Sequence, residues 1–322
     1  MKRIVVREPG GPGQMVIEEA ATPEPEAGQV RIVVAASGVN FIDVYFRTGQ
    51  YRADVPVAIG SEAAGVVSAV GPGVTSVARG DRVACAMIRG SYAEQVVVPA
   101  AQVVKVPEGV ELDVAAAAML QGLTAHYLTR STFPVESGQT CLVHAAAGGA
   151  GGLVVQMARL RGARVIGTVS TEAKAREARE LGCDEVINYA VEDFAPAVRR
   201  LTGDRGVDVV YDSVGQATFD GSLSVVRPRG TLVLFGQSSG PVAPLDPQVL
   251  NARGSIYLTR PSLAHYVATP EELRWRATEL FDAVTSGRVR VRISARYRLA
   301  EAARAHEALE ARRTTGKLLL VP

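Results

Sequence analysis

The sequence has little cysteine, and its cysteines do not suit a disulfide framework. Only three occur in 322 residues, Cys85, Cys141 and Cys183, and they lie far apart. An odd number of scattered cysteines fits a reducing compartment, and it is too few for the four clustered thiolates of a structural zinc site. We therefore expect a cytoplasmic protein.

Long apolar runs and a strong excess of one charge are also absent. No uninterrupted apolar stretch approaches the roughly 18 residues that a membrane span needs. The N-terminal run stops at Arg7 and Glu8, which argues against a signal peptide. A net charge of +2 gives little general attraction to nucleic acid or membranes. What the chain does have is 47% hydrophobic residues over a length that favours two domains.

The hydrophobic pattern divides the chain. Residues 1 to about 110 hold short β-branched runs separated by Gly, Pro and Asp turns, which predicts a mostly antiparallel β unit. From about residue 122, strand and helix patterns alternate with short connections, which predicts an α/β unit with a parallel sheet covered on both faces. The last stretch, from about 263, ends in "KLLLV", which we expect to return to the first unit.

A glycine-rich loop opens the first helix of the α/β unit. The stretch "HAAAGGAGG" covers residues 144–152 and follows the strand pattern "TCLV". A loop of this kind brings backbone N–H groups against a pyrophosphate at a helix N-terminus, although its spacing departs from a strict G-x-G-x-x-G. We assign dinucleotide binding to Ala147, Gly148, Gly149, Ala150 and Gly151. The alternative is a turn that serves packing alone.

The end of the second strand pattern bears on the choice of cofactor. NAD sites usually place a carboxylate about 20 residues past the glycines. Here the strand ends at Ser170, and Lys174 follows. A hydroxyl and an ammonium are donors for a 2′-phosphate, so NADPH is favoured over NADH. Alternatively, Ser170 caps the helix and Lys174 lies on its solvated face.

A series of motifs along the whole chain carries a family resemblance. They include "GVNFIDVYFRTGQY" (38–51), "GSEAAGVVSAVGPGV" (60–74), "LQGLTAHY" (120–127), "AAAGGAGG", "VVYDSVG" and "LFGQSSG". In this order they resemble the quinone oxidoreductase branch, with its zeta-crystallin-type enzymes, of the medium-chain dehydrogenase/reductase superfamily. The resemblance implies a GroES-like catalytic domain (1–122 and 263–322) interrupted by a Rossmann NADPH-binding domain (123–262). It also implies NADPH in the cleft between them and a homodimer paired through the strand "SIYLTR".

The resemblance makes zinc a sharp question, because related alcohol dehydrogenases bind it through an early cysteine and a G-H-E histidine. This chain has Asn40 in "GVNFID" and Ser61 in "GSE", so both ligands are missing, while Glu62 stays in place. The four histidines show no paired ligand spacing and are expected to be satisfied polar residues. We predict no metal.

Without zinc, hydrogen-bond donors have to polarise the acceptor. In the resembled family the segment around 38–51 lines the nicotinamide and acceptor site, which implies catalytic roles for Tyr51, Asn40, Asp43 and Tyr45, with Tyr51 as the donor. Alternatively, Asn40 and Asp43 cap a helix turn and the tyrosines pack against the wall. Arg47 and Gln50 contact either substrate or solvent.

The matching motifs imply further cofactor contacts. Tyr127 falls near the nicotinamide, Tyr189 at the 2′-phosphate end and Ser213 at the adenosine ribose. The end of a parallel strand places Phe235, Gln237 and Ser239 at the ligand edge of the sheet. Lys317 reaches the cofactor from the catalytic domain, although structural roles are equally open for Phe235 and Lys317.

The sequence also contains patterns of two other function classes. "GQSSG" satisfies the nucleophile-elbow pattern of hydrolases, but Pro241 and Pro244 follow where a helix must begin. The stretch 287–298 places Arg288, Arg290 and Arg292 on one face of a predicted strand, where they could meet RNA phosphates. An amphipathic edge strand has the same pattern, so RNA binding is a minor alternative.

Loss of zinc argues against simple alcohol oxidation. Quinones and the activated double bonds of enals and enones remain as acceptors. The sequence therefore predicts an NADPH-dependent quinone reductase, with an alkenal or enone reductase as the alternative.

Overall fold

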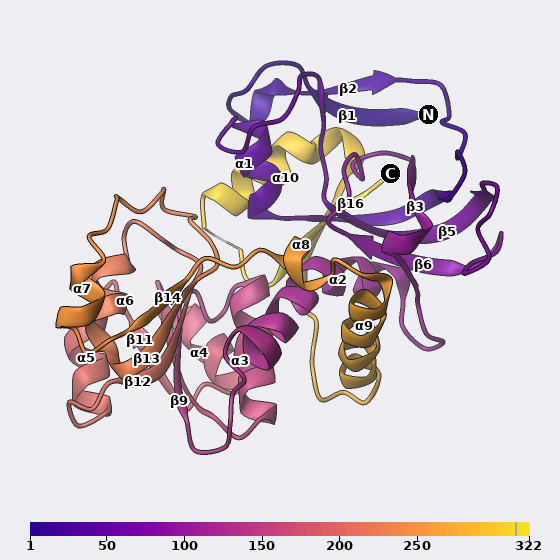
Figure 1. Ribbon diagram of the computed structural model, residues 1–322. Helices are drawn as coiled ribbons and strands as arrows, with labels where there is room; N and C mark the ends of the chain where they lie inside the picture. The colour runs from indigo at the N-terminus through magenta and orange to yellow at the C-terminus, as the bar shows by residue number, and fades with distance from the viewer. Residues whose placement is uncertain (313) are drawn as a thin grey trace. The chain divides into compact units, whose positions relative to one another are not determined.

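The computed structural model describes residues 1–312 and 314–322, which form two compact units (Figure 1). The first unit combines Met1–Leu123 with Tyr266–Pro322, and the second is Thr124–His265. No helix among the described residues is long and apolar enough to cross a membrane.

The first unit is built on mainly antiparallel sheets, with one parallel pair, β15 and β16. Its larger sheet has the order β15-β16-β3-β5-β6-β8, with β7 also paired to β3, and a small sheet has the order β2-β1-β4. The strands are β1 (Lys2–Val6), β2 (Met15–Glu19), β3 (Gln29–Val39), β4 (Val57–Ala58), β5 (Glu62–Val70), β6 (Arg82–Ala86), β7 (Gln95–Pro99), β8 (Val103–Lys105), β15 (Ile293–Arg298) and β16 (Lys317–Val321). The helices that bear on the site are α1 (Phe41–Arg47), α9 (Pro270–Thr285), α10 (Ala302–Glu310) and α2 (Leu112–Tyr127), of which the part up to Leu123 belongs to this unit.

The C-terminal strand joins this unit as the sequence predicts. β16 runs antiparallel to β3, with Leu318 opposite Val39 and Leu320 opposite Ser37. Apolar side chains from β16, β3 and α10 share one core cluster, so burial holds the last strand in place. The pairing puts Lys317 beside the junction of β3 and α1.

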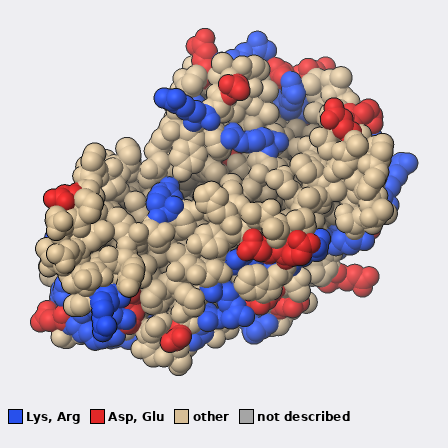
Figure 2. All heavy atoms as spheres, viewed as in Figure 1, with Lys and Arg blue, Asp and Glu red and all other residues tan. Residues whose placement is uncertain are grey.

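The predicted arginine face of a strand at 287–298 is wrong. β15 begins only at Ile293, so Arg288, Arg290 and Arg292 precede it. The regular pairing with β16 starts where Ile293 lies opposite Lys317, so the residues before Ile293 are not part of the strand ladder. Figure 2 shows basic and acidic side chains close to one another on the viewed face.

The second unit confirms the predicted doubly wound α/β fold. Its six parallel strands have the order β11-β10-β9-β12-β13-β14. The strands are β9 (Thr140–Val143), β10 (Arg164–Val169), β11 (Glu185–Asn188), β12 (Val207–Asp212), β13 (Val226–Leu234) and β14 (Tyr257–Thr259); the helices include α3 (Gly149–Leu160), α4 (Glu172–Glu180), α5 (Phe194–Leu201), α6 (Phe219–Val225) and α7 (Gln248–Ala252).

The strand order reverses between β9 and β12, and this position decides where a ligand fits. Helices α3 and α4 cover one face, and α5 and α6 cover the other (Figure 1). Buried side chains of the central strands, such as Leu142 and Val210, share a core with side chains of α5 and α6. The helices contribute Phe194 and Leu223 to this core. In sheets of this type the ligand crevice lies at the carboxyl ends of the strands where the order reverses.

Candidate functional site

The glycine-rich loop lies at the carboxyl end of β9. Gly148 is the N-cap of α3 and supplies no capping side chain. A Cβ on Gly151 would collide with the carbonyl oxygen of Ala145, so glycine is required for the first turn of α3 to approach the loop. The first N–H groups of a helix need a partner from outside it, and no side chain caps these. The loop, including Ala147, therefore fits a pyrophosphate.

The end of β10 presents a hydroxyl and an ammonium together. Lys174 Nζ lies 3.3 Å from Ser170 Oγ. The alternative in which Ser170 caps the helix is wrong, because Thr171 is the N-cap and its Oγ1 accepts from the Lys174 backbone N–H at 3.2 Å. Ser170 is thereby left beside the lysine, and two donors meet at the ligand edge of the sheet. That chemistry suits a phosphate monoester.

The loops that follow β12 and β13 are hydrogen-bonded to each other. The Ser239 hydroxyl donates to Val214 O at 2.7 Å and accepts from the Ala217 N–H at 2.9 Å. It therefore ties the loops together and has little capacity left for a ligand. Phe235 and Ser213 belong to the same pair of loops, since the Phe235 N–H donates to Asp212 O and the Ser238 N–H to Ser213 O. Gln237 lies in the loop after β13, which has no helix until α7 and so does not form a nucleophile elbow.

The two predicted aromatic cofactor residues differ in exposure. Tyr189, directly after β11, is 45% exposed and available for stacking. Tyr127, the last residue of α2, is only 2% exposed. Its predicted place near the nicotinamide stays a prediction.

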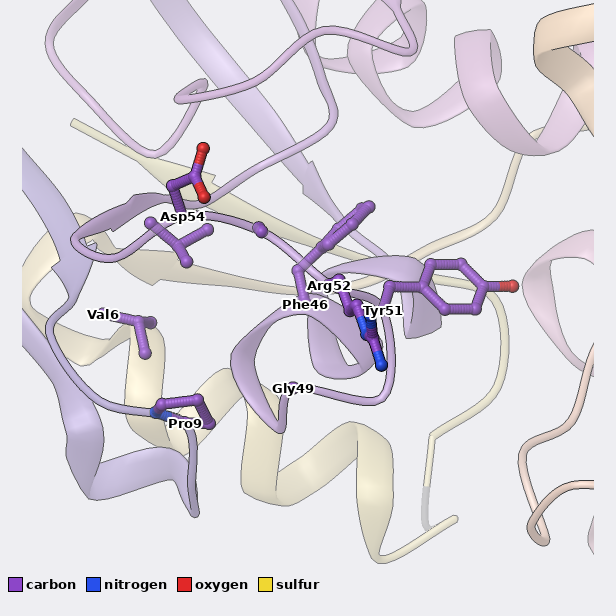
Figure 3. Close-up of a pocket in the computed structure, with 9 residues that line it drawn as sticks. Val6, Pro9, Phe46, Gly49, Tyr51, Arg52 and Asp54 are labelled. Carbon is purple, nitrogen blue, oxygen red and sulfur yellow. The ribbon is translucent and has the colours of Figure 1, made fainter.

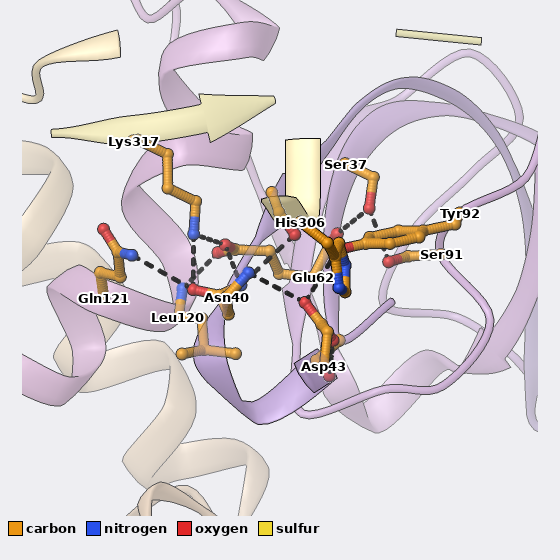
Figure 4. A network of polar contacts seen from close by, with 12 residues as sticks. Ser37, Asn40, Asp43, Glu62, Ser91, Tyr92, Leu120, Gln121, His306 and Lys317 are labelled. Carbon is orange, nitrogen blue, oxygen red and sulfur yellow. Dashed lines mark hydrogen bonds and ion pairs between the residues drawn. The ribbon is translucent and has the colours of Figure 1, made fainter. Parts of the chain in front are cut away.

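The first unit contains a largely buried polar network around Asn40 (Figure 4). Asn40 Oδ1 accepts from Lys317 Nζ at 2.6 Å and from Gln121 Nε2 at 3.3 Å. Its Nδ2 donates to Glu62 Oε1 at 2.7 Å and to Gly38 O at 3.3 Å. Both lone pairs and both N–H groups are used. Asn40 therefore holds its neighbours in place and has no polar group left for a substrate.

Lys317 belongs to this network and does not face solvent. It is 1% exposed, and its ammonium forms an ion pair with Glu62, which is itself fully buried. Burial lowers the pKa of Lys317, and the Glu62 carboxylate opposes that shift. We therefore assign Lys317 the structural role, and the predicted cofactor contact is withdrawn.

A second branch of the network ends at Asp43. Its carboxylate accepts from Ser61 Oγ at 2.6 Å, from Tyr92 Oη at 3.1 Å and from the Asn40 N–H at 3.0 Å. The last contact is half of a capping box for α1, as the alternative interpretation had it. Burial raises the pKa of Asp43 to about 6. Asp43 is 0% exposed, and its hydrogen bonds hold the start of α1 in place.

His306 extends this branch toward Arg47. Its Nε2 lies 3.0 Å from Tyr92 Oη and its Nδ1 lies 3.4 Å from Arg47 Nη1. Because arginine only donates, Nδ1 is the acceptor and the proton sits on Nε2. The branch is thus directional, from Arg47 through His306 and Tyr92 to Asp43. Burial, with the Arg47 charge, lowers the pKa of His306 to about 3.

The predicted substrate or solvent contact of Arg47 is wrong. Arg47 is 1% exposed and forms two hydrogen bonds with Glu310 of α10, at 2.9 and 2.7 Å. The burial follows from the packing of α1 against α10, which no local pattern signals.

The predicted tyrosines form an aromatic cluster at the end of α1. The Tyr51 ring centroid lies 5.1 Å from that of Tyr45 and 5.4 Å from that of Phe46. A pocket of about 470 Å³ lies beside them, lined by Val6, Pro9, Phe46, Gly49, Tyr51, Arg52, Ala53, Asp54 and Val57. Figure 3 shows the Tyr51 hydroxyl pointing away from Val6 and Pro9. Tyr51 therefore presents its hydroxyl on the side of the loop opposite those residues.

The prediction that all four histidines are satisfied polar residues is confirmed for His144 and His306. His144 hydrogen-bonds Thr168 Oγ1 and Ser222 Oγ, both at 2.8 Å, and His306 is paired as described above. Among residues 1–312 and 314–322, no three His, Cys, Asp or Glu side chains gather in a way that could hold a metal ion.

The chain matches known families over most of its length. Residues 26–108 match the alcohol dehydrogenase GroES-like domain, and residues 149–280 match the zinc-binding dehydrogenase family. A quinone oxidoreductase of Pseudomonas aeruginosa is 46% identical over 100% of this chain and 99% of its own. The chain belongs to the quinone oxidoreductase family, within the medium-chain dehydrogenase/reductase superfamily.

Two other members refine the comparison. A mycobacterial protein solved in complex with NADPH is 52% identical, with a TM-score of 0.98 over 100% of both chains. A 2-haloacrylate reductase of a Burkholderia species is 44% identical over 99% of this chain and 98% of its own. The family therefore includes proteins named for two kinds of acceptor.

Sequence reasoning missed several members of the site that this family member builds. Tyr92, His306 and Gln121 come from segments far apart in the chain, and no local motif marks Tyr92 or His306. Gln121 lay inside the quoted motif "LQGLTAHY", which is the one signal that could have identified it.

Proposed function

We propose that the protein is an NADPH-dependent quinone reductase that works without zinc. Two observations support NADPH as the cofactor. The first turn of α3 has no side-chain cap and lies near the carboxyl ends of the strands, and Ser170 and Lys174 lie together at the end of β10. The quinone assignment is supported by the full-length similarity to the Pseudomonas quinone oxidoreductase.

NADPH supplies a hydride, and with one proton from solvent the quinone becomes a hydroquinone while NADP⁺ is released. In the second unit, the N–H groups of Gly149, Ala150 and Gly151 bind the pyrophosphate. Lys174 and Ser170 bind the 2′-phosphate, and Tyr189 stacks beside it. Ser213, Gln237 and Tyr127 complete the set of cofactor contacts as predicted from the motifs.

In the first unit, Tyr51 is the donor to the oxygen on which negative charge develops. Its hydroxyl points away from Val6 and Pro9, and its ring is packed against Tyr45, which limits the positions it can adopt (Figure 3). Asn40 and Asp43 hold α1, which carries Tyr45 and leads to Tyr51. Both act through this placement and not through contact with the acceptor.

We propose that the site binds no zinc, because the side chains at the expected ligand positions are poor zinc ligands. Asn40 and Ser61 stand where the resembled zinc enzymes have a cysteine and a histidine, and here both are engaged in hydrogen bonds. An amide and a hydroxyl are poor zinc ligands compared with thiolate and imidazole. Stoichiometric zinc in the purified protein, measured by mass spectrometry, would overturn this.

The function is tested by following NADPH consumption with parallel panels of quinones, α,β-unsaturated carbonyl compounds and simple aldehydes. Fast turnover of quinones, with NADPH preferred to NADH, is the expected result. Turnover of aldehydes alone would contradict the proposal.

A second candidate is reduction of an activated double bond. The observation that favours it is the 44% identity to a 2-haloacrylate reductase, which is named for an unsaturated acid. The cofactor site would be the same, and only the acceptor would differ. Turnover of enones or haloacrylates faster than quinones would move the assignment to this candidate.

We also propose a cytoplasmic homodimer. β14 is the edge strand of the sheet in the second unit, and Tyr257 on it is 66% exposed. Free cysteines, each buried, suit a reducing compartment. A monomeric mass in light scattering would contradict the dimer.

A further inference from the structure

Gln121 belongs to the network around Asn40, and one end of its side-chain amide points away from that network. Its Nε2 lies 3.3 Å from Asn40 Oδ1. Within the part of the chain that the structure describes, its Oε1 has no hydrogen-bond partner, and the residue is half-buried. Figure 4 shows the side chain reaching from α2 to Asn40 with its oxygen turned away from the network.

The chemistry of the network fixes which end of this amide faces out. The ammonium of Lys317 can only donate, so the Asn40 atom that faces it must be the acceptor Oδ1. Gln121 meets the same Oδ1, so it must present its N–H donor there. Its Oε1 is therefore forced outward, and the outward group is a hydrogen-bond acceptor.

The backbone on either side of Gln121 is fixed as well. The Leu120 N–H donates to Glu62 Oε2 at 2.7 Å. A Cβ on Gly122 would lie 2.7 Å from the side chain of Leu280 on α9, so α2 and α9 pack closely there. An acceptor held in this way loses little conformational freedom when it binds a ligand.

We propose that Gln121 Oε1 accepts a hydrogen bond from a neutral N–H or O–H donor of the bound reactants. The inference rests on the proposed function, which supplies two such donors: the carboxamide NH₂ of the nicotinamide and the hydroxyl of the hydroquinone product. A carbonyl oxygen repels an oxyanion, so Gln121 has a role different from that of Tyr51.

The first arm of the test distinguishes the carboxamide. Dissociation constants for NADPH and for its 3-acetylpyridine analogue, in which a methyl group replaces the NH₂, are measured by fluorescence without any acceptor. If the carboxamide is the donor, the wild type prefers NADPH and Gln121→Met reduces that preference by about 3- to 10-fold, the value of one neutral hydrogen bond.

The second arm distinguishes the product hydroxyl. Inhibition constants are measured for a hydroquinone and for its dimethyl ether, which has no donor. If the hydroxyl is the donor, Gln121→Met reduces the preference for the hydroquinone by about the same factor. Gln121→Leu repeats both arms without a sulfur that could accept, and Gln102→Met, in the first unit outside the network, is the matched control.

Each outcome decides the matter. A changed ratio in either arm, with Gln102→Met unchanged, supports the inference and identifies the donor. Unchanged ratios in both arms overturn it, as does an equal loss of affinity for each compound and its donor-free analogue. A wild type that binds no NADPH overturns the proposed function and the inference with it. A wild type that turns over normally beside unchanged ratios overturns the inference alone.

Discussion

The Nζ atom of Lys317 lies 2.6 Å from Oδ1 of Asn40, although 277 positions separate the two residues in the chain. The pairing of β16 with β3 creates this contact. Because both side chains are buried, the contact is not replaced by water when one partner is removed. The ammonium orients the Asn40 amide and neutralises the buried Glu62 carboxylate. A change at Lys317 therefore acts on the fold and on the site together.

Replacing Lys317 by methionine is expected to lower the free energy of unfolding by about 3–5 kcal/mol, because it leaves the Glu62 charge buried without a partner. Urea unfolding measures the loss. The double variant Lys317→Met with Glu62→Gln should recover much of it, since no uncompensated charge remains. Lys105→Met, at an exposed pair with Asp81, should cost at most about 1 kcal/mol. Equal losses at Lys105 and Lys317 would contradict this account.

The network should give the protein an acid sensitivity that depends on His306. The folded protein keeps His306 neutral until its pKa of about 3, whereas the unfolded chain takes up the proton near 6.5. The unfolded state thus binds more protons between these values, and stability falls as the pH drops through 6.5. His306→Gln should reduce the decline in unfolding free energy between pH 7 and pH 4.

Asp43 provides a control of opposite sign. Its folded pKa of about 6 lies above the ordinary aspartate pKa of 3.8 that the unfolded chain has, so between these values the folded state binds more protons. This contribution is present at low pH and is lost as the pH rises through 6. The difference in unfolding free energy between Asp43→Asn and the wild type should therefore shift in favour of the variant as the pH rises from 4 to 6. A constant cost of the substitution does not change this trend. The same slope in both variants would refute the opposing assignments.

Cofactor selectivity should depend on Lys174. Lys174→Ala removes the ammonium proposed to bind the 2′-phosphate, and we expect NADPH affinity to fall about 10-fold, the effect of a charged hydrogen bond. NADH affinity should be unchanged, because NADH has no 2′-phosphate. Arg179→Ala on the same helix is the control, since Arg179 pairs with Glu172 on an exposed surface. Equal losses for the two dinucleotides would count against the phosphate contact.

The sequence predicted features that local chemistry determines, and it missed those that long-range pairing determines. Strand and helix alternation gave the doubly wound unit, and the glycine loop appeared where it was expected. The sequence offers the capping of a helix turn by Asn40 and Asp43 as an alternative, and the structure has a capping box at these two residues. Tyr92 could not be placed because it lies 49 positions from Asp43, and His306 could not be placed because it meets Tyr92 only after α10 returns to the first unit. The burial of Arg47 and Lys317 also depends on partners that are distant in the sequence, Glu310 and Glu62. A charged residue next to an apolar run does not by itself indicate such a partner.

Tyr51→Phe is the most direct test of the proposed chemistry. The ring and its contacts with Tyr45 and Phe46 remain, so the fold should be unaffected, and only the hydroxyl is lost. Removing one donor to a developing oxyanion typically lowers kcat by about 100-fold. We expect a loss of this size in kcat for quinones, with the dissociation constant for NADPH unchanged. Tyr297→Phe on β15 is the matched control and should keep full activity. An unchanged kcat in Tyr51→Phe would assign the hydroxyl a packing role and would direct the search for the donor to Tyr45, whose ring lies beside it.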